Sequence, residues 1–306
     1  MYKKIVIITR RTRLEELVNR FNTRSQARFY IEHAGGEFAD YEREDDAYRS
    51  SLDQVRRALE FEMPQQLVDR GLVPTFQFQK EDIVVTLGQD GLVANTAKYA
   101  GAQPIVALNP EPTRFDGILL PFLPADARAT VGRLIEGKAR IREVTLAAAT
   151  LNDGQRLLAF NDLFIGARTH VSALYRISAG KQTEAQSSSG ILVSTGAGST
   201  GWISSVFNMS SGVASFCGGQ PVKPVRFDWE DRRLLYVVRE PFLSRHSQVG
   251  IVAGTIEEKA DLVIESLMPS GGAIFSDGME ADFLEFNSGS TARIRIAEQR
   301  AHLVVS

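Results

Sequence analysis

Short runs of consecutive apolar residues mark the first third of the chain. They lie at residues 5–8, 83–87 and 104–108, and the last two follow charged or polar residues. Strands that are apolar on both faces are typical of a buried parallel sheet. Between the first two runs, apolar residues recur at helical spacing from 14 to 21 and again from about 48 to 60. The pattern predicts strands that alternate with helices, the order of an α/β domain.

A different pattern begins after a further predicted helix at about 126–137. Two period-two segments, 140–151 and 156–165, flank Asn152-Asp153-Gly154, which predicts a β-hairpin. Strand-like runs then follow one another to the end of the chain, and one helix, about 202–211, interrupts them. These runs lie at about 171–178, 190–194, 234–239, 248–254, 260–266, 272–276, 281–286 and 292–296. We therefore predict an α/β N-terminal domain with a parallel, Rossmann-like sheet over 1–125 and a β-rich C-terminal domain over 126–306.

Composition and charge narrow the classes of function. The chain is 43% apolar and 24% charged, which is ordinary for a globular protein, and its net charge of −2 provides no basic field for bulk nucleic acid or an anionic membrane. Its four histidines follow no metal-ligand spacing, and its single cysteine, Cys217, excludes an internal disulfide. The first apolar run is too short for a signal peptide or a membrane span. We expect a cytoplasmic protein with no resident metal, no nucleic-acid partner and no membrane partner.

Two glycine-rich turns are candidates for binding an anion. The first, Gly88-Gln89-Asp90-Gly91, follows a buried strand and precedes a predicted helix. There the backbone N–H groups approach phosphate oxygens, and a carboxylate accepts the proton of a hydroxyl. Asp-Gly is also an ordinary turn sequence. Arg10, Arg11 and Arg13 follow the first strand. They either lie near phosphates, or they pair with Glu15, Glu16 or solvent on the surface of the following helix.

The second turn spans residues 194–202 and lies between a strand-like run and a helix. It contains three glycines and four hydroxyl side chains, so its backbone can approach a polar ligand closely. Ser199 or Thr200 also suits the N-cap of the following helix. Trp202 offers a face on which a planar ring can stack, although an indole is more often part of a core.

Together these turns resemble the motifs of the NAD kinase family. The chain contains Gly88-Gln89-Asp90-Gly91, then Asn161-Asp162, then the turn at 194–201, then Asp277-Gly278, in the order of that family's GGDG, Asn-Glu, TGST-type and late Asp-Gly motifs. The likeness spans about residues 4–300 and is strongest to the mitochondrial-type branch and its bacterial relatives.

The resemblance implies a kinase that transfers a phosphoryl group from ATP, with Mg²⁺, to the 2′-hydroxyl on the adenosine ribose of NAD or NADH. Asp90 would be the catalytic base, with Gly88, Gln89 and Gly91 binding phosphates. The residues implied to bind NAD are Asn161, Asp162, Ser189, Ser199, Thr200, Gly201, Trp202 and Asp277. The family also forms homo-oligomers through its β-rich domain, which implies a homodimer or homotetramer.

Departures from the family's motifs leave alternatives open. Gln89 replaces a glycine. If the position needs a positive φ or close approach of a phosphate, this side chain costs roughly 1–2 kcal/mol or blocks the ligand; alternatively, its amide donates to the phosphate itself. Leu92 and Ala197 replace threonines, and Asp162 is one methylene shorter than glutamate. The alternatives to an NAD kinase are a kinase of the same fold that acts on a sugar, nucleoside or lipid hydroxyl, and a protein that binds a dinucleotide without turnover.

Overall fold

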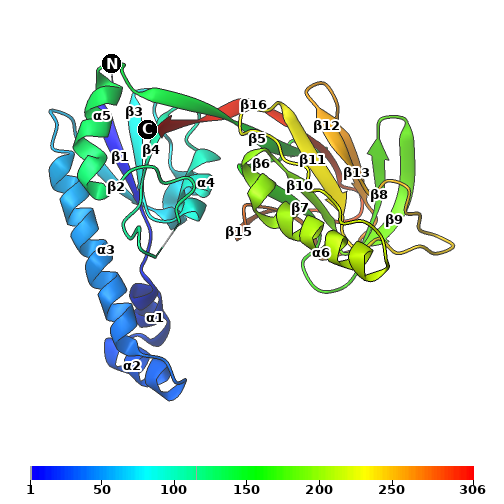
Figure 1. The fold of residues 1–306 in the computed structure, drawn as a ribbon, viewed down its shortest axis with the longest axis horizontal. Coiled ribbons are helices and arrows are strands. Elements are labelled where there is room, and N and C mark those ends of the chain that lie inside the picture. The colour runs from blue at the N-terminus through cyan, green and yellow to red at the C-terminus, as the bar shows by residue number, and fades with distance from the viewer. Residues whose placement is uncertain (1, 115) are drawn as a thin grey trace. The chain divides into compact units, whose positions relative to one another are not determined.

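The computed structural model describes residues 2–114 and 116–306, with the backbone alone at 280 and 281, and divides them into two compact units. Unit 1 comprises the chain up to Arg142 together with His302–Ser306, and unit 2 comprises Glu143–Ala301. Figure 1 shows the elements of both units. By compactness, residues 126–142 therefore group with the N-terminal part of the chain.

Unit 1 is built on a parallel sheet in the order β2-β1-β3-β4. Its strands are β1 (Lys4–Thr9), β2 (Gln65–Asp69), β3 (Asp82–Leu87) and β4 (Pro104–Leu108), and β3 and β4 are buried along their whole length. The end of the long strand β16 (Thr291–Val305) pairs in parallel with β4 at His302 and Leu303. Residues from the C-terminus therefore complete the N-terminal sheet.

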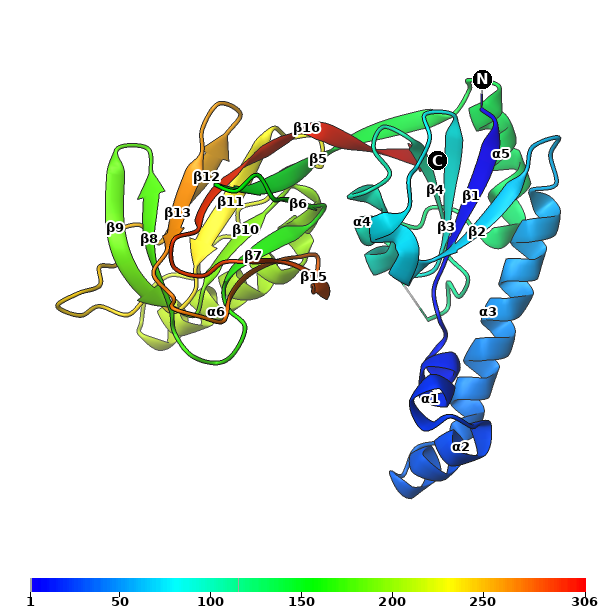
Figure 2. The same ribbon diagram turned by 180° about the vertical axis from the view of Figure 1, so that it is seen from behind.

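Six helices accompany this sheet, counting the described 3₁₀ turn η1. They are α1 (Arg13–Phe21), α2 (Arg24–His33), α3 (Phe38–Ala58), η1 (Arg70–Thr75), α4 (Asp90–Ala97) and α5 (Ala127–Ile135), the last preceded by the short turn η2 (Pro124–Asp126). Tyr48 and Val55 of α3 and Val131 of α5 pack on Val85 and Val106 of the sheet. In Figure 2, α1 and α2 lie beside the N-terminal part of α3, where Leu14, Ala27, Ile31 and Phe38 form a small separate core.

The strand order of unit 1 reverses direction beside β1. From β1 the chain goes outward to β2 and then returns across β1 to form β3 on its other side. In an open parallel sheet, ligands bind at the carboxyl ends of the strands on the two sides of such a switch. The ends of β1 and β3 are followed by Arg10 and by the Gly88–Gly91 turn, so the topology puts these two segments at the expected ligand-binding edge.

Unit 2 contains two antiparallel sheets around a common apolar core. One sheet has the order β12-β11-β10-β7-β14-β15, with β7 (Asp162–Ala167), β10 (Ile191–Ser194), β11 (Arg233–Val238), β12 (Ala253–Glu257), β14 (Gly272–Ser276) and β15 (Met279–Glu285). The other joins β16 to β13 (Leu262–Ser266), β8 (Ala173–Ala179) and β9 (Gln182–Ser188), with β5 (Arg140–Leu151) and β6 (Arg156–Ala159) beside them. The turn η3 (Ala197–Thr200) leads into α6 (Trp202–Phe216), and Ile203 packs on Leu192 and Leu235 of the first sheet.

The predicted fold class is confirmed: a parallel α/β unit is followed by an antiparallel β-rich unit. The hairpin at Asn152–Gly154 is also confirmed, whereas the predicted strand 156–165 is broken at residues 160–161 into β6 and β7. Strands β2 and β9 and helix α2 were not expected, because polar residues fill most of their positions. No described helix has the length and apolar character that a membrane-spanning segment requires.

Candidate functional site

The first glycine-rich turn joins β3 to α4 at the switch edge of unit 1. Its first residue, Gly88, donates its N–H to Leu108 O at 3.2 Å, and a Cβ at this position would lie 2.8 Å from the Leu92 side chain. Gln89 is the N-cap of α4 with φ −96°, and a Cβ at Gly91 would meet nothing within 4 Å. Only Gly88 is therefore required for packing. The position of Gln89 needs no positive φ, so its side chain causes no backbone strain.

Asp90 begins α4 and faces the chain that follows β4. Its Oδ1 accepts a hydrogen bond from Leu119 N at 2.8 Å, and no other partner of this carboxylate occurs in the described part of the chain. The bond fixes one oxygen and leaves the other available to a ligand at the helix N-terminus. A carboxylate held in this way can orient a hydroxyl and accept its proton.

Three arginines, two of them after β1 and one after β4, contact the same buried carboxylate. Glu44 of α3 is only 3% exposed, and it contacts Arg10 Nη1 at 3.2 Å, Arg114 Nη1 at 3.0 Å and Arg13 Nε. Burial alone would raise the pKa of Glu44, but the hydrogen bonds and charges of Arg13 and Arg114 outweigh it and lower the pKa. Glu15 instead pairs with Arg49, at 3.1 Å. Among the alternatives for these arginines, pairing with Glu15 or Glu16 is therefore not observed for Arg10 and Arg13.

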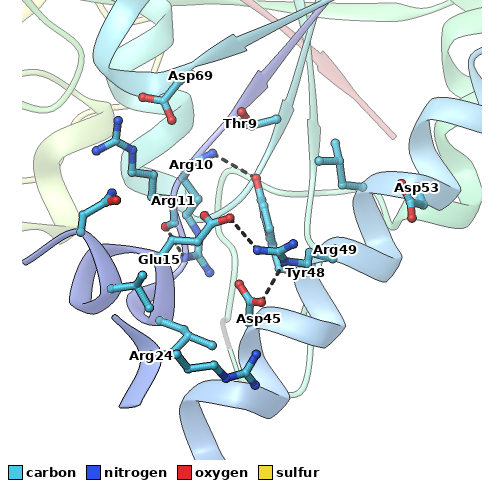
Figure 3. Close-up of a pocket in the computed structure, with 14 residues that line it drawn as sticks. Thr9, Arg10, Arg11, Glu15, Arg24, Asp45, Tyr48, Arg49, Asp53 and Asp69 are labelled. Atoms are coloured by element: carbon cyan, nitrogen blue, oxygen red, sulfur yellow. Dashed lines mark hydrogen bonds and ion pairs between the residues drawn. The ribbon is translucent and has the colours of Figure 1, made fainter. Parts of the chain in front are cut away.

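Beside β1, a cavity of about 840 Å³ opens between the strand end, α1 and α3 (Figure 3). Arg10 N donates to Tyr48 Oη at 3.0 Å, and that hydroxyl donates to Leu87 O at 3.0 Å. Arg49 lies between Glu15 and Asp45, 2.8 Å from the latter. Burial raises the pKa of Tyr48 to about 12, so the hydroxyl remains a neutral link between β1, α3 and β3. Of the charges that face this cavity, those of Glu15, Asp45 and Arg49 are paired with one another.

In unit 2, one carboxylate organises the break between β6 and β7. Asp277 accepts hydrogen bonds from the backbone N–H groups of Phe160, Asn161 and Asp162, at 2.9, 2.6 and 3.2 Å. Its own N–H donates to Asp162 O at 3.0 Å, and its φ is +52°, so it lies in the left-handed region. The late Asp-Gly motif and the Asn-Asp motif therefore form a single structural feature.

The second glycine-rich turn packs tightly against neighbouring backbone. A Cβ at Gly196 would lie 1.9 Å from Asp228 O, and a Cβ at Gly198 would lie 2.1 Å from Asn161 O. Thr195 Oγ1 donates to Phe160 O at 2.5 Å and accepts from Gly198 N at 3.2 Å. These glycines are thus required by the protein's own packing. The turn is tied to the Asn161 segment, not left open around a ligand.

A pocket of about 450 Å³ lies over the six-stranded sheet and has an aromatic floor. Phe164 of β7 lies opposite Phe275 of β14 and stacks on Trp202, with ring centroids 5.6 Å apart. The Phe164 ring covers the backbone of Gly166 and Gly190, where a Cβ would approach it to within 2.8 and 2.6 Å. The guanidinium of Arg239 lies over the Trp202 ring at 5.2 Å. Such a surface offers ring faces for stacking and a nearby positive charge for an anion.

Asp162 is the buried acid of this pocket. It is 8% exposed, and burial, with a smaller effect from the charge of Asp277, raises its pKa from 3.8 to about 7. At or below neutral pH its carboxyl group therefore retains a proton and can donate a hydrogen bond as well as accept one.

Replacing Asp162 by Asn should change how stability depends on pH. The unfolded carboxyl ionises near pH 3.8 and the folded one near 7, so the wild type loses stability as the pH rises through this window. Asp162→Asn cannot ionise, and its melting temperature should exceed that of the wild type by a few degrees at pH 8 and by less at pH 5. Thermal unfolding at both pH values measures this. Equal shifts at the two pH values would contradict the raised pKa.

The structure brings together only some of the predicted binding residues. Asp162, Trp202 and Asp277 line the aromatic pocket, whereas Asn161, Ser189, Ser199, Thr200 and Gly201 do not. Ser199 Oγ accepts from Phe227 N at 3.2 Å, and Ser189 Oγ donates to the Glu240 carboxylate. Phe164, Arg168 and Phe275 also line the pocket and were not predicted. Their shared face follows from the pairing of β7 with β14, for which the sequence carries no signal.

Comparison with known proteins gives the same fold from two solved structures. Yeast NADH kinase complexed with NADH aligns with all of this chain and 84% of its own, with a TM-score of 0.58 and 16% identity. An NAD kinase from Archaeoglobus fulgidus in complex with ATP covers 98% of this chain and 93% of its own, with a TM-score of 0.53 and 14% identity. The fold is that of the NAD kinases.

Sequence similarity to an NAD kinase covers a smaller part of the chain than the structural similarity does. The NAD kinase of Halobacterium salinarum is 32% identical over 173 residues, which amount to 49% of this chain and 58% of that protein. The match therefore spans little more than half the length of this curated relative. No protein-family model matches the chain.

The departures from the NAD kinase motifs are all accommodated by this fold. Gln89 has an ordinary φ, and Leu92 is 2% exposed and fills the space beside Gly88. Ala197 is buried in η3. The backbone cost of a positive φ at Gln89 therefore does not arise, and donation of its side-chain amide to a phosphate stays a prediction.

Proposed function

We propose that the chain is an ATP-dependent kinase that phosphorylates the 2′-hydroxyl on the adenosine ribose of NAD or NADH. The observation that carries the proposal is Asp90, a carboxylate with one oxygen fixed at the N-terminus of α4, at the switch edge of a sheet with the NAD kinase fold. The relatives named NAD kinase and NADH kinase support this acceptor.

In this proposal, unit 1 supplies the phosphoryl-transfer chemistry. Asp90 orients the acceptor hydroxyl and takes its proton as the oxygen attacks the terminal phosphorus of ATP. The backbone N–H groups of Gln89 and Gly91 lie at the helix N-terminus, where they can bind a phosphate oxygen. Gly88 keeps the turn against Leu92 and so fixes the direction in which α4 begins.

Magnesium is assigned to the ATP substrate and not to a resident site. In the described residues no three acidic, histidine or cysteine side chains form a cluster able to hold a metal ion. Mg²⁺ in such enzymes is bound largely by substrate phosphates and water, so the ion would enter with ATP, and the free oxygen of Asp90 would remain available to the acceptor hydroxyl. When bound with ATP, the ion would neutralise charge that develops on the transferred phosphoryl group.

Unit 2 is assigned to recognition of the dinucleotide. The rings Phe164 and Trp202 provide a stacking face, Asp162 provides a buried donor and acceptor, and Arg239 provides a cation for the diphosphate. Asp277 acts as a positioning residue, because it holds the backbone from which Asp162 projects. The other predicted NAD-binding residues would then act by shaping the loops around this pocket.

The proposal is tested by incubating the purified protein with Mg·ATP and either NAD or NADH, and by measuring NADP(H) with a dehydrogenase specific for it. We expect product that increases with enzyme concentration and requires both substrates. A protein that forms no NADP(H) from either acceptor contradicts the proposal. Parallel reactions with sugars, nucleosides and lipids would then test the other acceptors.

Trp202→Ala should weaken binding of NAD by about tenfold, because stacking of a base on an aromatic ring contributes about 1–3 kcal/mol. Phe242→Ala is the matched control, since Phe242 is an aromatic residue of unit 2 that is 64% exposed and does not line the pocket. Calorimetric titration with NAD, without ATP, measures both variants. Equal affinities of the two variants would show that the aromatic pocket is not the dinucleotide site.

We also propose that the protein forms a homo-oligomer through unit 2. Helix α6 has no charged residue, and Met209, Val213 and Phe216 on it are all at least half exposed. An apolar helix face of this kind is typical of surfaces that are covered in an assembly. Light scattering of the wild type gives the mass of the particle.

A further inference from the structure

A second hollow of unit 1 adjoins the cavity of Figure 3, with which it shares Arg10, Arg11 and Asp69, and lies at the ends of β1, β2 and β3. It has a volume of about 470 Å³, and its ten lining residues include Gln89. Five of them are arginines, namely Arg10, Arg11, Arg13, Arg70 and Arg114, and three are acidic. We call it the arginine pocket. Its lining carries a formal charge of +2, whereas the lining of the cavity in Figure 3 contains four arginines and four acids and is neutral.

Three of the five guanidinium groups of the arginine pocket are held in place before any ligand arrives. Arg10, Arg13 and Arg114 all bind Glu44, whose side chain is 2% exposed. Each guanidinium has five N–H donors, and one carboxylate has too few acceptor sites to bind all the donors of three guanidinium groups. Arg10 Nε is one of these: it is buried and has no hydrogen-bond partner in the described residues. One buried anion thus fixes a set of cations whose donors it does not saturate.

Two further side chains of the pocket are uncommitted. The guanidinium of Arg11 is exposed and makes no ion pair within the described residues. The Gln89 side chain makes no hydrogen bond to them either, although it begins the turn that contains Asp90. Both can donate N–H groups to an anion without breaking an existing contact. A chain of phosphates is the ligand whose repeated charge and acceptor oxygens match this set of donors.

We propose that the arginine pocket binds the phosphate chain of the phosphate donor, with Arg11 and Gln89 as its specificity-determining contacts. The inference rests on the proposed function, since that function names the bound chain as a donor. It extends the donor site from the turn at Asp90 to the end of β1, across the switch point. It also gives Gln89, the residue that departs from the family's glycine, a role in holding phosphate.

The test is a calorimetric titration with two probes, ATP and inorganic tripolyphosphate, without NAD. Arg11→Ala should weaken binding by about tenfold, the effect of losing one charge-assisted contact, and Gln89→Ala by about threefold. Arg57→Ala is the matched control. It removes the same charge from an exposed position on α3, 13 residues and about 20 Å along the helix from Glu44, and it should leave both affinities unchanged.

The two probes identify the source of the phosphates. Equal Arg11-dependent binding of both means that the pocket recognises the phosphate chain alone, and binding of ATP only means that the nucleoside contributes. Either result supports the inference. It is overturned if the wild type binds neither probe, or if Arg11→Ala and Arg57→Ala bind alike. Because no NADP is formed in these titrations, failure of the kinase assay and failure of the pocket are separate results.

Discussion

Asp90→Asn should lower kcat for NADP formation by at least about 100-fold, the usual contribution of a general base. The asparagine Oδ1 can still accept the hydrogen bond from Leu119 N, so the start of α4 and the shape of the turn should be unchanged. Its amide cannot accept the proton of the ribose hydroxyl. Steady-state kinetics with saturating Mg·ATP and NAD measure the loss, and KM for each substrate should change by less than about threefold.

Asp126→Asn is the control for this variant. Asp126 Oδ2 also accepts one backbone hydrogen bond in unit 1, from Leu123 N at 2.9 Å, and it lies outside the switch edge. Its substitution should leave kcat unchanged. If Asp90→Asn were as active as Asp126→Asn, Asp90 would be a helix-capping residue and some other group would have to accept the proton.

Glu44→Gln should destabilise unit 1 by about 2–3 kcal/mol. Removing one partner of a fully buried ion pair costs about 3–5 kcal/mol. The effect here is smaller because the side chains of Arg13 and Arg114 are 43% and 38% exposed and can be hydrated. The glutamine is of the same size but leaves Arg10, 11% exposed, without a countercharge. Urea unfolding at pH 7 measures the change.

Glu42→Gln is the matched control, two residues earlier on the same helix. Glu42 also binds two arginines, Arg24 and Arg28, but both are more than half exposed, and such surface pairs contribute little. The pKa of Glu44 is lowered in the folded state, so its stabilisation is complete above the ordinary value of 4.5 and is lost as the pH falls below it. The gap between the wild type and Glu44→Gln should therefore narrow at acidic pH. A gap that stays constant down to pH 3 would contradict the ion-pair explanation.

The fold could be predicted from sequence wherever burial left a regular pattern. Strands β3 and β4 are buried along their whole length and mostly apolar, and Asn152-Asp153-Gly154 specifies its hairpin through turn conformation. The long helix α3 was predicted from residue 48 only. Its first half carries six charged residues, and the burial of one of them, Glu44, depends on arginines distant in sequence.

The candidate site could be predicted only where a single local motif contains the residues that form it. The turn at Gly88–Gly91 follows its strand directly, so the local sequence is enough to place Asp90 at the start of a helix. Phe164 and Phe275 are 111 residues apart and meet only because β7 pairs with β14. Gly196 and Gly198 were expected to admit a ligand, but their neighbours are carbonyl groups of residues 228 and 161. Tertiary packing decides whether a ligand or another part of the chain lies against a glycine, and the local sequence does not predict which of them it is.

The return of β16 to unit 1 has a consequence for how the protein is made on the ribosome. Strand β4 pairs with β3 on one side and with His302 and Leu303 on the other. Until residues 302 and 303 emerge, the N-terminal sheet therefore has an uncovered apolar strand at its edge, a surface on which other chains can add. Unit 1 begins to form before unit 2 but is completed only after unit 2 has been synthesised. Protection of the N-terminal sheet from misassembly during synthesis therefore depends on how soon β16 pairs with β4.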